Sequence, residues 1–207
     1  MELYVIRHGA TESNENGIWQ GSELNTPLCG KGRDQARAIG GMLAGRGIER
    51  VFASDLARAQ ETAAILSRRI GVPVETVEAL REVKLGAWSG MTREEAYAAY
   101  PEFLQHPERL IDSAPPGGET QLDVLARAQA AFAGITACGL SRVAVVSHGA
   151  LLRTWFCAAM GMPLENRDRI VLQNGAVAHF TYDELRHRYR LHALTRCDEA
   201  CGGESIL

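Results

Sequence analysis

Short apolar runs alternate with longer amphipathic segments along most of the chain. The apolar runs LYVI, RVFAS and VAVVSH, at residues 3–6, 50–54 and 143–148, are rich in β-branched residues and bounded by polar ones. Such runs are typical of strands buried on both faces. The amphipathic segments predict helices at about 30–45, 56–69, 92–100, 119–137 and 149–160. This alternation predicts an α/β fold, a three-layer sandwich with a mostly parallel central sheet flanked by helices.

The C-terminal part of the chain has a different pattern. Residues 176–194 read as two alternating strands around a turn at Asp183 and Glu184, which predicts a hairpin at an edge of the sheet. The tail at about 195–207 contains glycines and little pattern, and we expect it to be a loose end.

Nothing in the chain indicates a division into domains. The sequence has no internal repeat, low-complexity run or interdomain linker, and its 207 residues, 46% of them hydrophobic, are enough for one sizeable core. We therefore expect a single domain over 1–207. The segment at about 91–118, which carries aromatic residues, is predicted to form a lid over a site.

Charge and cysteine content narrow the function classes. The formal charge of −3, from 22 basic and 25 acidic residues, gives no basic excess for nucleic acid or an anionic membrane. Five cysteines, an odd number in a chain of this size, indicate reduced thiols. Cys197 and Cys201 have a spacing that could hold a metal, but no second Cys/His pair with zinc-like spacing accompanies them, so we expect no metal.

The N-terminus and the hydropathy pattern allow a prediction of where in the cell the protein lies. MELYVIRHG lacks the charged head and long apolar run of a signal peptide, and no apolar stretch is long enough to span a bilayer. A cytoplasmic protein is expected. Its partner would be a small molecule, and the pattern leaves a homodimer open.

Two histidines follow predicted strands, and each is followed by a glycine. His8 and Gly9 come after the first strand, and His148 and Gly149 after the strand VAVVS. Ligand crevices in open α/β sheets lie beyond the carboxyl ends of the strands, where glycine lets the backbone come close to a ligand. Two such pairs favour a reaction centre at this edge over a charged surface loop.

Two arginines are expected beside these histidines. Arg7 precedes His8, and Arg58 falls in the first turn of the helix that follows RVFAS. Arg58 in isolation reads equally well as a solvated helix residue. Together, two guanidinium groups and two imidazoles would form a pocket suited to a phosphate dianion.

Several motifs then recur in one order. They are RHG (7–9), QG (20–21) with PLCGKGRDQA (27–36), SDLARAQETA (54–63), LREVKLGAWSG (80–90), PPGGET (115–120) and VVSHGALLR (145–153). In this order the chain resembles the histidine phosphatase superfamily, also called the phosphoglycerate mutase-like family, from about residue 2 to 180. Arg-His-Gly alone is a weak signal, whereas the ordered set is specific.

The resemblance implies roles for individual residues. His8 would take the phosphoryl group, Arg7, Arg58 and His148 would hold it, and Glu82 would be the proton donor. The substrate-binding set would comprise Thr11, Asn14, Gln20, Gly21 and Gly149. The role implied for His8 is chemically reasonable, because a neutral imidazole can attack phosphorus near neutral pH. Arginines supply the charge stabilisation that Mg²⁺ gives in kinases, so neither a metal nor another cofactor is expected.

The family contains mutases and phosphatases, and departures from the mutase pattern favour a phosphatase. Mutases follow the position of Glu82 with Arg-His-Tyr-Gly, whose arginine and tyrosine bind a second anionic group, where this chain has VKLG at 83–86. Ala150 replaces a mutase asparagine. We expect hydrolysis of a small phosphate monoester such as α-ribazole phosphate, phosphoserine or a sugar phosphate. A cofactor-dependent phosphoglycerate mutase and a catalytically silent phospho-ligand binding protein remain as alternatives.

Smaller features complete the predictions. Cys29 stands where a serine or threonine would cap the following helix, so that helix start is expected to be weaker. Trp88 reads as a packing residue, and His106 as a lid residue. The other histidines, His179, His187 and His192, match no catalytic motif and are interpreted as structural.

Overall fold

The structure, a computed structural model, describes residues 1–196 and 205–206. Its centre is a mixed sheet with strand order β3-β2-β4-β1-β5-β6-β7. The strands are β1 (Glu2–Arg7), β2 (Arg50–Ala53), β3 (Val74–Thr76), β4 (Arg142–Ser147), β5 (Ala176–Asp183), β6 (Arg188–Arg196) and β7 (Ser205–Ile206). Cys197 and Cys201, whose spacing we considered for a metal site, lie outside the described residues.

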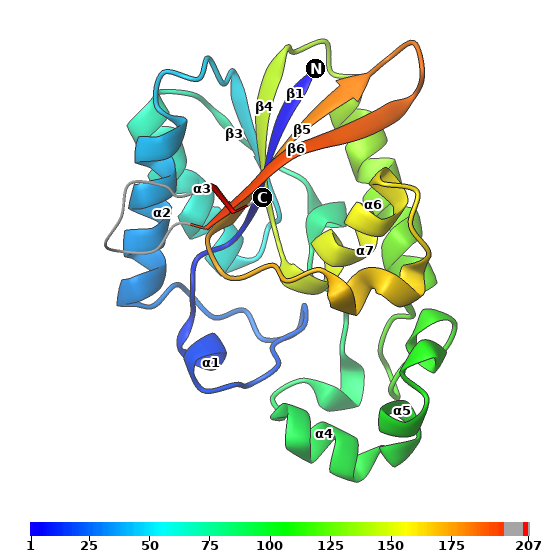
Figure 1. The fold of residues 1–207 in the computed structure, drawn as a ribbon. Coiled ribbons are helices and arrows are strands. Elements are labelled where there is room, and N and C mark those ends of the chain that lie inside the picture. The colour runs from blue at the N-terminus through cyan, green and yellow to red at the C-terminus, as the bar shows by residue number, and fades with distance from the viewer. Residues whose placement is uncertain (197–204, 207) are drawn as a thin grey trace.

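Helices cover both faces of this sheet. They are α1 (Glu12–Glu15), α2 (Gly30–Leu43), α3 (Ala57–Ile70), α4 (Arg93–Ala99), α5 (Pro101–Gln105), α6 (Gln121–Thr136) and α7 (Gly149–Ala159). Short 3-10 helices add η1 (Glu78–Leu80), η2 (Gly86–Trp88), η3 (Pro107–Ile111) and η4 (Leu164–Arg169). Figure 1 shows α2 and α3 on one side of the sheet and α6 and α7 on the other. The predicted three-layer α/β fold is confirmed.

The sheet combines a parallel part with an antiparallel edge. Strands β3, β2, β4 and β1 are mutually parallel, whereas β5 runs antiparallel to β1 and forms the predicted hairpin with β6. The short strands β3 and β7 were not predicted, because their few residues show no apolar alternation that stands out from a loop.

Alternation along the central strands explains the two cores. In β1, Leu3 and Val5 belong to the core beneath α6 and α7, whereas Tyr4 and Ile6 belong to the core beneath α2 and α3. Successive side chains of a strand point to opposite faces, so a strand covered on both sides needs apolar residues throughout. Strand β4 follows the same rule.

The parallel strands all end at one edge of the sheet, and smaller helices lie beyond it. Figure 1 shows α1, α4 and α5 below this lower edge. Trp88, 2% exposed, packs there against Phe103, Tyr97 and Trp19, with ring centroids 5.2, 5.7 and 5.3 Å away. This small separate core connects the segment after β3 to the loop that follows α1.

The helices α2 and α3 both start without a side-chain cap from their own N-cap residue. Leu56 is the N-cap residue of α3, and the Asn25 side chain accepts a hydrogen bond of 2.6 Å from Ala57 N. Cys29 is the N-cap residue of α2 and makes no side-chain cap bond.

The described residues contain neither a candidate membrane span nor a candidate metal site. No helix there combines the length and the apolar composition required to cross a bilayer. No group of three or more His, Cys, Asp or Glu side chains among those residues could hold a metal ion.

Candidate active site

The ends of β1 and β4 bring two histidines together. Arg7 pairs with Ser147 in the register of these neighbouring parallel strands, so the next residues, His8 and His148, are also neighbours. Their ring centroids lie 5.1 Å apart, and both side chains are buried. The meeting of the two His-Gly pairs therefore follows from the register of adjacent parallel strands.

The contacts of His8 define its tautomer. Nδ1 lies 2.7 Å from the carbonyl oxygen of Gly9, so it must carry the proton and donate it, which leaves the lone pair on Nε2. Arg58 Nε donates to Nε2 at 3.3 Å. Burial holds the pKa of His8 well below its usual value, and the cations Arg58 and Arg7 act in the same direction. The ring is therefore neutral, and Nε2 is its basic atom.

Arg58 joins this pocket to the loop after α1. The side chain is 1% exposed, and its Nη1 and Nη2 donate to the carbonyl oxygens of Leu24 and Gly21 at 2.9 and 2.7 Å. Gly21 has φ of +56°, and a Cβ there would lie 2.4 Å from Glu23 Oε2. Gly21 thus contributes a carbonyl that orients Arg58, and Arg58 is not the solvated residue that a helix position alone allows.

Arg7 and His148 keep polar atoms without a partner. Arg7 Nη1 donates to the carbonyl oxygen of Leu172 at 2.7 Å, but its buried Nε and both ring nitrogens of His148 have no hydrogen-bond partner in the described structure. Burial lowers the pKa of Arg7 to about 10, opposed by Glu82, so the group is cationic at neutral pH. Burial also holds the pKa of His148 well below its usual value. Unpartnered donors around one point are typical of a ligand site.

Gly149 is needed where α7 begins. A Cβ at this position would lie 3.2 Å from Arg7 Cζ and 3.2 Å from Arg7 Nε, which is tighter than most real Cβ contacts. The absence of a side chain therefore lets the Arg7 guanidinium lie against the first turn of α7.

Glu82 reaches the same turn from the loop after η1. Its Oε2 accepts from Ala150 N at 3.1 Å, and its Oε1 accepts from Leu151 N at 3.0 Å. Arg81, a neighbour that could have paired with it, forms its ion pair with Asp55 instead. Glu82 raises the pKa of both Arg7 and Arg58, which places its charge near both cations. The carboxyl group is thus held at the pocket by the backbone of α7.

Asn14 is oriented by a residue that the sequence did not indicate. Its Oδ1 accepts from Thr11 N at 3.2 Å, from Thr11 Oγ1 at 3.1 Å and from Asn174 Nδ2 at 3.1 Å. Asn174 Nδ2 also donates to the carbonyl oxygen of His8 at 3.1 Å. With Oδ1 used by three donors, the Asn14 amide group can act only as a donor. In the sequence, Asn174 is only a polar residue followed by a glycine just before β5, and such a pair is common in loops.

Thr11 and Gln20 stabilise the turn that carries Asn14. The Thr11 hydroxyl is buried in a capping box with Asn14, and Gln20 Nε2 donates to it at 2.9 Å. Thr26 Oγ1 in turn donates to Gln20 Oε1. Both side chains thus hold the α1 turn in place beside the pocket.

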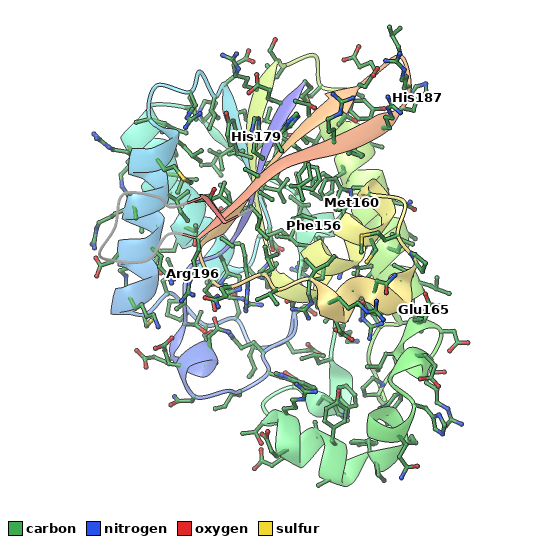
Figure 2. The ribbon with its side chains drawn as sticks, in the orientation of Figure 1. Phe156, Met160, Glu165, His179, His187 and Arg196 are labelled. Carbon is green, nitrogen blue, oxygen red and sulfur yellow. The ribbon has the colours of Figure 1, made fainter. Side chains whose placement is uncertain are left out.

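The remaining histidines lie away from the pocket. Figure 2 shows His179 on the sheet and His187 at the far tip of the β5–β6 hairpin. His192 lies on β6 beside His179, with ring centroids 5.2 Å apart. The exposed His106, in the segment expected to form the lid, contacts Glu108 at 3.1 Å.

Known proteins resemble the chain over most of its length. The family model of the histidine phosphatase superfamily (branch 1) matches residues 3–195. A glucosyl-3-phosphoglycerate phosphatase of Mycolicibacterium vanbaalenii is 38% identical over 172 residues, which cover 79% of this chain and 76% of that protein. A probable phosphoglycerate mutase GpmB of Salmonella paratyphi B is 30% identical over 189 residues, which cover 89% and 86% of the two chains.

A solved structure agrees in its overall fold. The complex of a mycobacterial glucosyl-3-phosphoglycerate phosphatase with VO3 superposes with a TM-score of 0.82 at 31% sequence identity, over 92% of this chain and 96% of that one. The sequence motifs, the fold and these relatives agree. The chain therefore belongs to the histidine phosphatase superfamily, branch 1.

Proposed function

We propose that this protein hydrolyses small phosphate monoesters through a phosphohistidine on His8, without a metal ion. One observation carries the proposal: His8 Nε2 is unprotonated and lies within reach of Arg58, in a pocket that Arg7 and His148 share. A neutral imidazole nitrogen beside fixed cations can attack phosphorus, while the cations stabilise the negative charge on the transferring oxygens.

The first half-reaction transfers the phosphoryl group to the enzyme. Nε2 of His8 forms a bond to phosphorus, and the bond from phosphorus to the ester oxygen breaks. The departing oxygen takes a proton from the Glu82 carboxyl group. Arg7, Arg58, Asn14 and a ring N–H of His148 donate to the phosphoryl oxygens.

The second half-reaction restores the enzyme. Water attacks the phosphorus of phosphohistidine, and its proton goes to the Glu82 carboxylate. The bond from phosphorus to Nε2 breaks, and inorganic phosphate leaves. Because the same carboxyl group gives and then takes one proton, each turnover returns Glu82 to its starting state.

The covalent intermediate gives the direct test. Rapid-quench turnover of a ³²P-labelled ester should place acid-labile, base-stable label on His8. The variant His8→Ala should lose label and activity, whereas His187→Ala, altered at the exposed hairpin tip, should retain both. Label on Ser13, Thr11 or a cysteine would overturn the assignment.

Independence from metal ions has its own test. Arginine and imidazole groups surround His8 in the described structure, so excess EDTA is expected to leave hydrolysis of p-nitrophenyl phosphate unchanged. Vanadate should inhibit, because it occupies a phosphoryl site. Activity lost in EDTA and restored by Mg²⁺ or Zn²⁺ would contradict this part of the proposal.

The mutase alternative has less support from the side chains after Glu82. Val83 is 5% exposed within the main core, and Leu85 packs between that core and the aromatic cluster around Trp88. Neither apolar side chain can bind an anion. With 3-phosphoglycerate and a bisphosphoglycerate primer, phosphate release is expected to exceed isomerisation. Isomerisation that outruns hydrolysis would favour the mutase.

The names of similar proteins suggest a class of substrate. Similar proteins are named glucosyl-3-phosphoglycerate phosphatase and putative alpha-ribazole-5'-P phosphatase. We propose that the substrate is a phosphate ester with a sugar-like or small organic alcohol, and a panel of such esters would identify it by kcat/KM.

A further inference from the structure

Arg127, on α6, has an acceptor for every N–H of its guanidinium group. Its Nε and Nη2 donate to the two carboxylate oxygens of Glu119 at 2.9 and 3.0 Å. Nη1 donates to the carbonyl oxygens of Ala79 and Arg81 at 3.0 and 2.6 Å, and Nη2 donates to that of Glu82 at 3.0 Å. A guanidinium group has five N–H donors, so these bonds account for all of them.

The loop that receives these bonds has no regular structure of its own. Residues 81–85 lie between η1 and η2, outside every helix and strand of the described structure. The backbone carbonyls of such a segment need partners from elsewhere in the fold. Glu119 adds a bond on the other side of Glu82, because its Oε2 also accepts from Lys84 N at 2.8 Å. Together, Arg127 and Glu119 form a clamp that holds the backbone before, at and after Glu82.

The packing of α6 determines where the clamp lies. Val124 and Ala128 are fully buried against the sheet, and Arg127 lies at the border of this buried face, with its side chain 21% exposed. Side chains of a helix lean toward its N-terminus. The guanidinium group therefore reaches back to Glu119, which precedes α6, and to the loop beside it. Its position depends on the helix and the core, which are fixed independently of the loop.

The carboxyl end of Glu82 is held by a different helix. Its oxygens accept from Ala150 N and Leu151 N at the start of α7, and Oε1 also accepts from Val83 N at 3.0 Å. Figure 1 shows α6 and α7 on the same side of the sheet, where both contribute to one core. Glu82 thus has its backbone fixed by α6 and its carboxyl group fixed by α7.

We propose that Arg127 is a positioning residue for proton transfer by Glu82: it fixes the loop so that the carboxyl group meets the ester oxygen of the substrate. This inference rests on the proposed phosphatase function. A general acid must come within about 2.6–3.2 Å of the atom that it protonates. A displacement of about 1 Å can cost about 100-fold in rate. Because Arg127 has no donor left for the phosphoryl group, its effect must pass through Glu82.

Two esters with different leaving groups test the assignment in the variant Arg127→Lys. Lysine keeps the positive charge but replaces the planar fork of five donors with three donors on one atom. The alkoxide that leaves from sn-glycerol 3-phosphate needs a proton, whereas the phenolate from p-nitrophenyl phosphate hardly does. The variant should lower kcat/KM for sn-glycerol 3-phosphate by about 10- to 100-fold and leave that for p-nitrophenyl phosphate nearly unchanged. Inhibition by vanadate should also stay the same.

A double variant shows whether Arg127 acts through Glu82. In Glu82→Gln the proton donor is absent, so the addition of Arg127→Lys should cause no further selective loss with sn-glycerol 3-phosphate. The matched control is Arg50→Lys, which alters an arginine–glutamate pair at the opposite end of the parallel strands and should change neither ester. Additive losses in the double variant, weaker vanadate inhibition, or equal losses with both esters would overturn the assignment.

A second variant keeps the test decisive if Arg127→Lys does not fold, which thermal unfolding would show. Glu119→Gln leaves one acceptor oxygen where the carboxylate accepts three bonds, two from Arg127 and one from Lys84 N. It should give the same selective loss with sn-glycerol 3-phosphate. An unchanged ratio of the two kcat/KM values in Glu119→Gln would exclude the positioning role.

Failure of the proposed phosphatase function has a different signature. If the wild-type protein releases phosphate from neither ester, the hydrolase itself is excluded. If it hydrolyses only p-nitrophenyl phosphate, no proton donor serves an alkyl leaving group, and the roles of Glu82 and Arg127 fall together. If it hydrolyses both esters and the variants of the clamp slow both equally, the hydrolase stands and the role of Arg127 falls.

Discussion

At the scale of single residues, the pocket combines neutral imidazoles with arginines whose charge is only partly balanced. His8 and His148 stay uncharged because burial and the surrounding cations oppose their protonation. Glu82 is the acidic group that acts on both Arg7 and Arg58. A dianionic phosphoryl group would complete this charge distribution and give a partner to Arg7 Nε and to the His148 ring, which have none in the described structure.

The role of Glu82 can be tested through the leaving group. Glu82→Gln should slow hydrolysis of alkyl phosphates by about 10²- to 10⁴-fold, the usual contribution of a general acid. An aryl ester such as p-nitrophenyl phosphate leaves as a stable phenolate and hardly needs a proton. Its burst of nitrophenolate in stopped-flow measurements should remain fast, even though the later hydrolysis of phosphohistidine is slow. Equal damage to both esters would mean that Glu82 only positions the phosphate.

Asn174 is predicted to act as a positioning residue for Asn14. Asn174→Asp replaces the Nδ2 donor with an acceptor that repels Asn14 Oδ1, so the Asn14 amide should flip and vanadate inhibition should weaken by about 10-fold, as expected for a lost bond to a charged group. Asn25→Ala, which removes an amide cap of α3, is the matched control. Thermal unfolding reports folding separately, and a loss of stability with unchanged vanadate inhibition would contradict the positioning role.

At the scale of elements, the start of α7 carries the site. His148 is its N-cap residue, Gly149 leaves room for Arg7, and the next two backbone N–H groups hold Glu82. These amides would be unpaired at an isolated helix terminus. The free N–H groups at the start of α7 therefore orient the Glu82 carboxyl group. A side chain at Gly149 would crowd the Arg7 guanidinium group.

The start of α2 allows a prediction on stability. Cys29 has extended backbone angles suitable for an N-cap residue but makes no side-chain cap bond. Cys29→Ser should add a bond to an N–H in the first turn and raise the free energy of unfolding above that of Cys29→Ala by about 1 kcal/mol. Urea unfolding of the two variants measures the difference. Equal values would show that the serine hydroxyl finds no donor there.

At the scale of the whole molecule, the buried histidines link stability to pH. Both have pKa values below the unfolded value of about 6.5. As pH falls below about 6.5, the unfolded chain binds protons that the native state does not, and the free energy of unfolding falls by up to about 1.4 kcal/mol per pH unit per histidine. This loss continues until pH reaches the lowered native pKa.

The variant His148→Gln isolates one of these contributions. Between pH 6 and pH 5 its free energy of unfolding should fall less steeply than that of wild type, by up to about 1.4 kcal/mol per pH unit. Denaturant unfolding at each pH measures the slope, with the exposed His187→Gln as a control that leaves it unchanged. An unaltered slope in His148→Gln would show that His148 protonates readily in the native state.

The sequence alone determined the layered fold and the centre of the site. Residues 3–6 and 143–146 are apolar at every position, which only strands covered on both faces require, and His8 and His148 directly follow these strands. Their meeting was predictable because parallel neighbours end at one edge. The antiparallel hairpin at 176–194 was predictable for a similar reason, since its alternation and turn are local.

Only the tertiary structure decided how the site is supported. Glu82 is held by amides of α7 that lie far along the chain, and Asn174 orients Asn14 across an even longer separation. Pattern and spacing describe what a residue does within its own strand or helix. These contacts depend on which loops the fold brings to the same edge of the sheet, and local periodicity does not encode that.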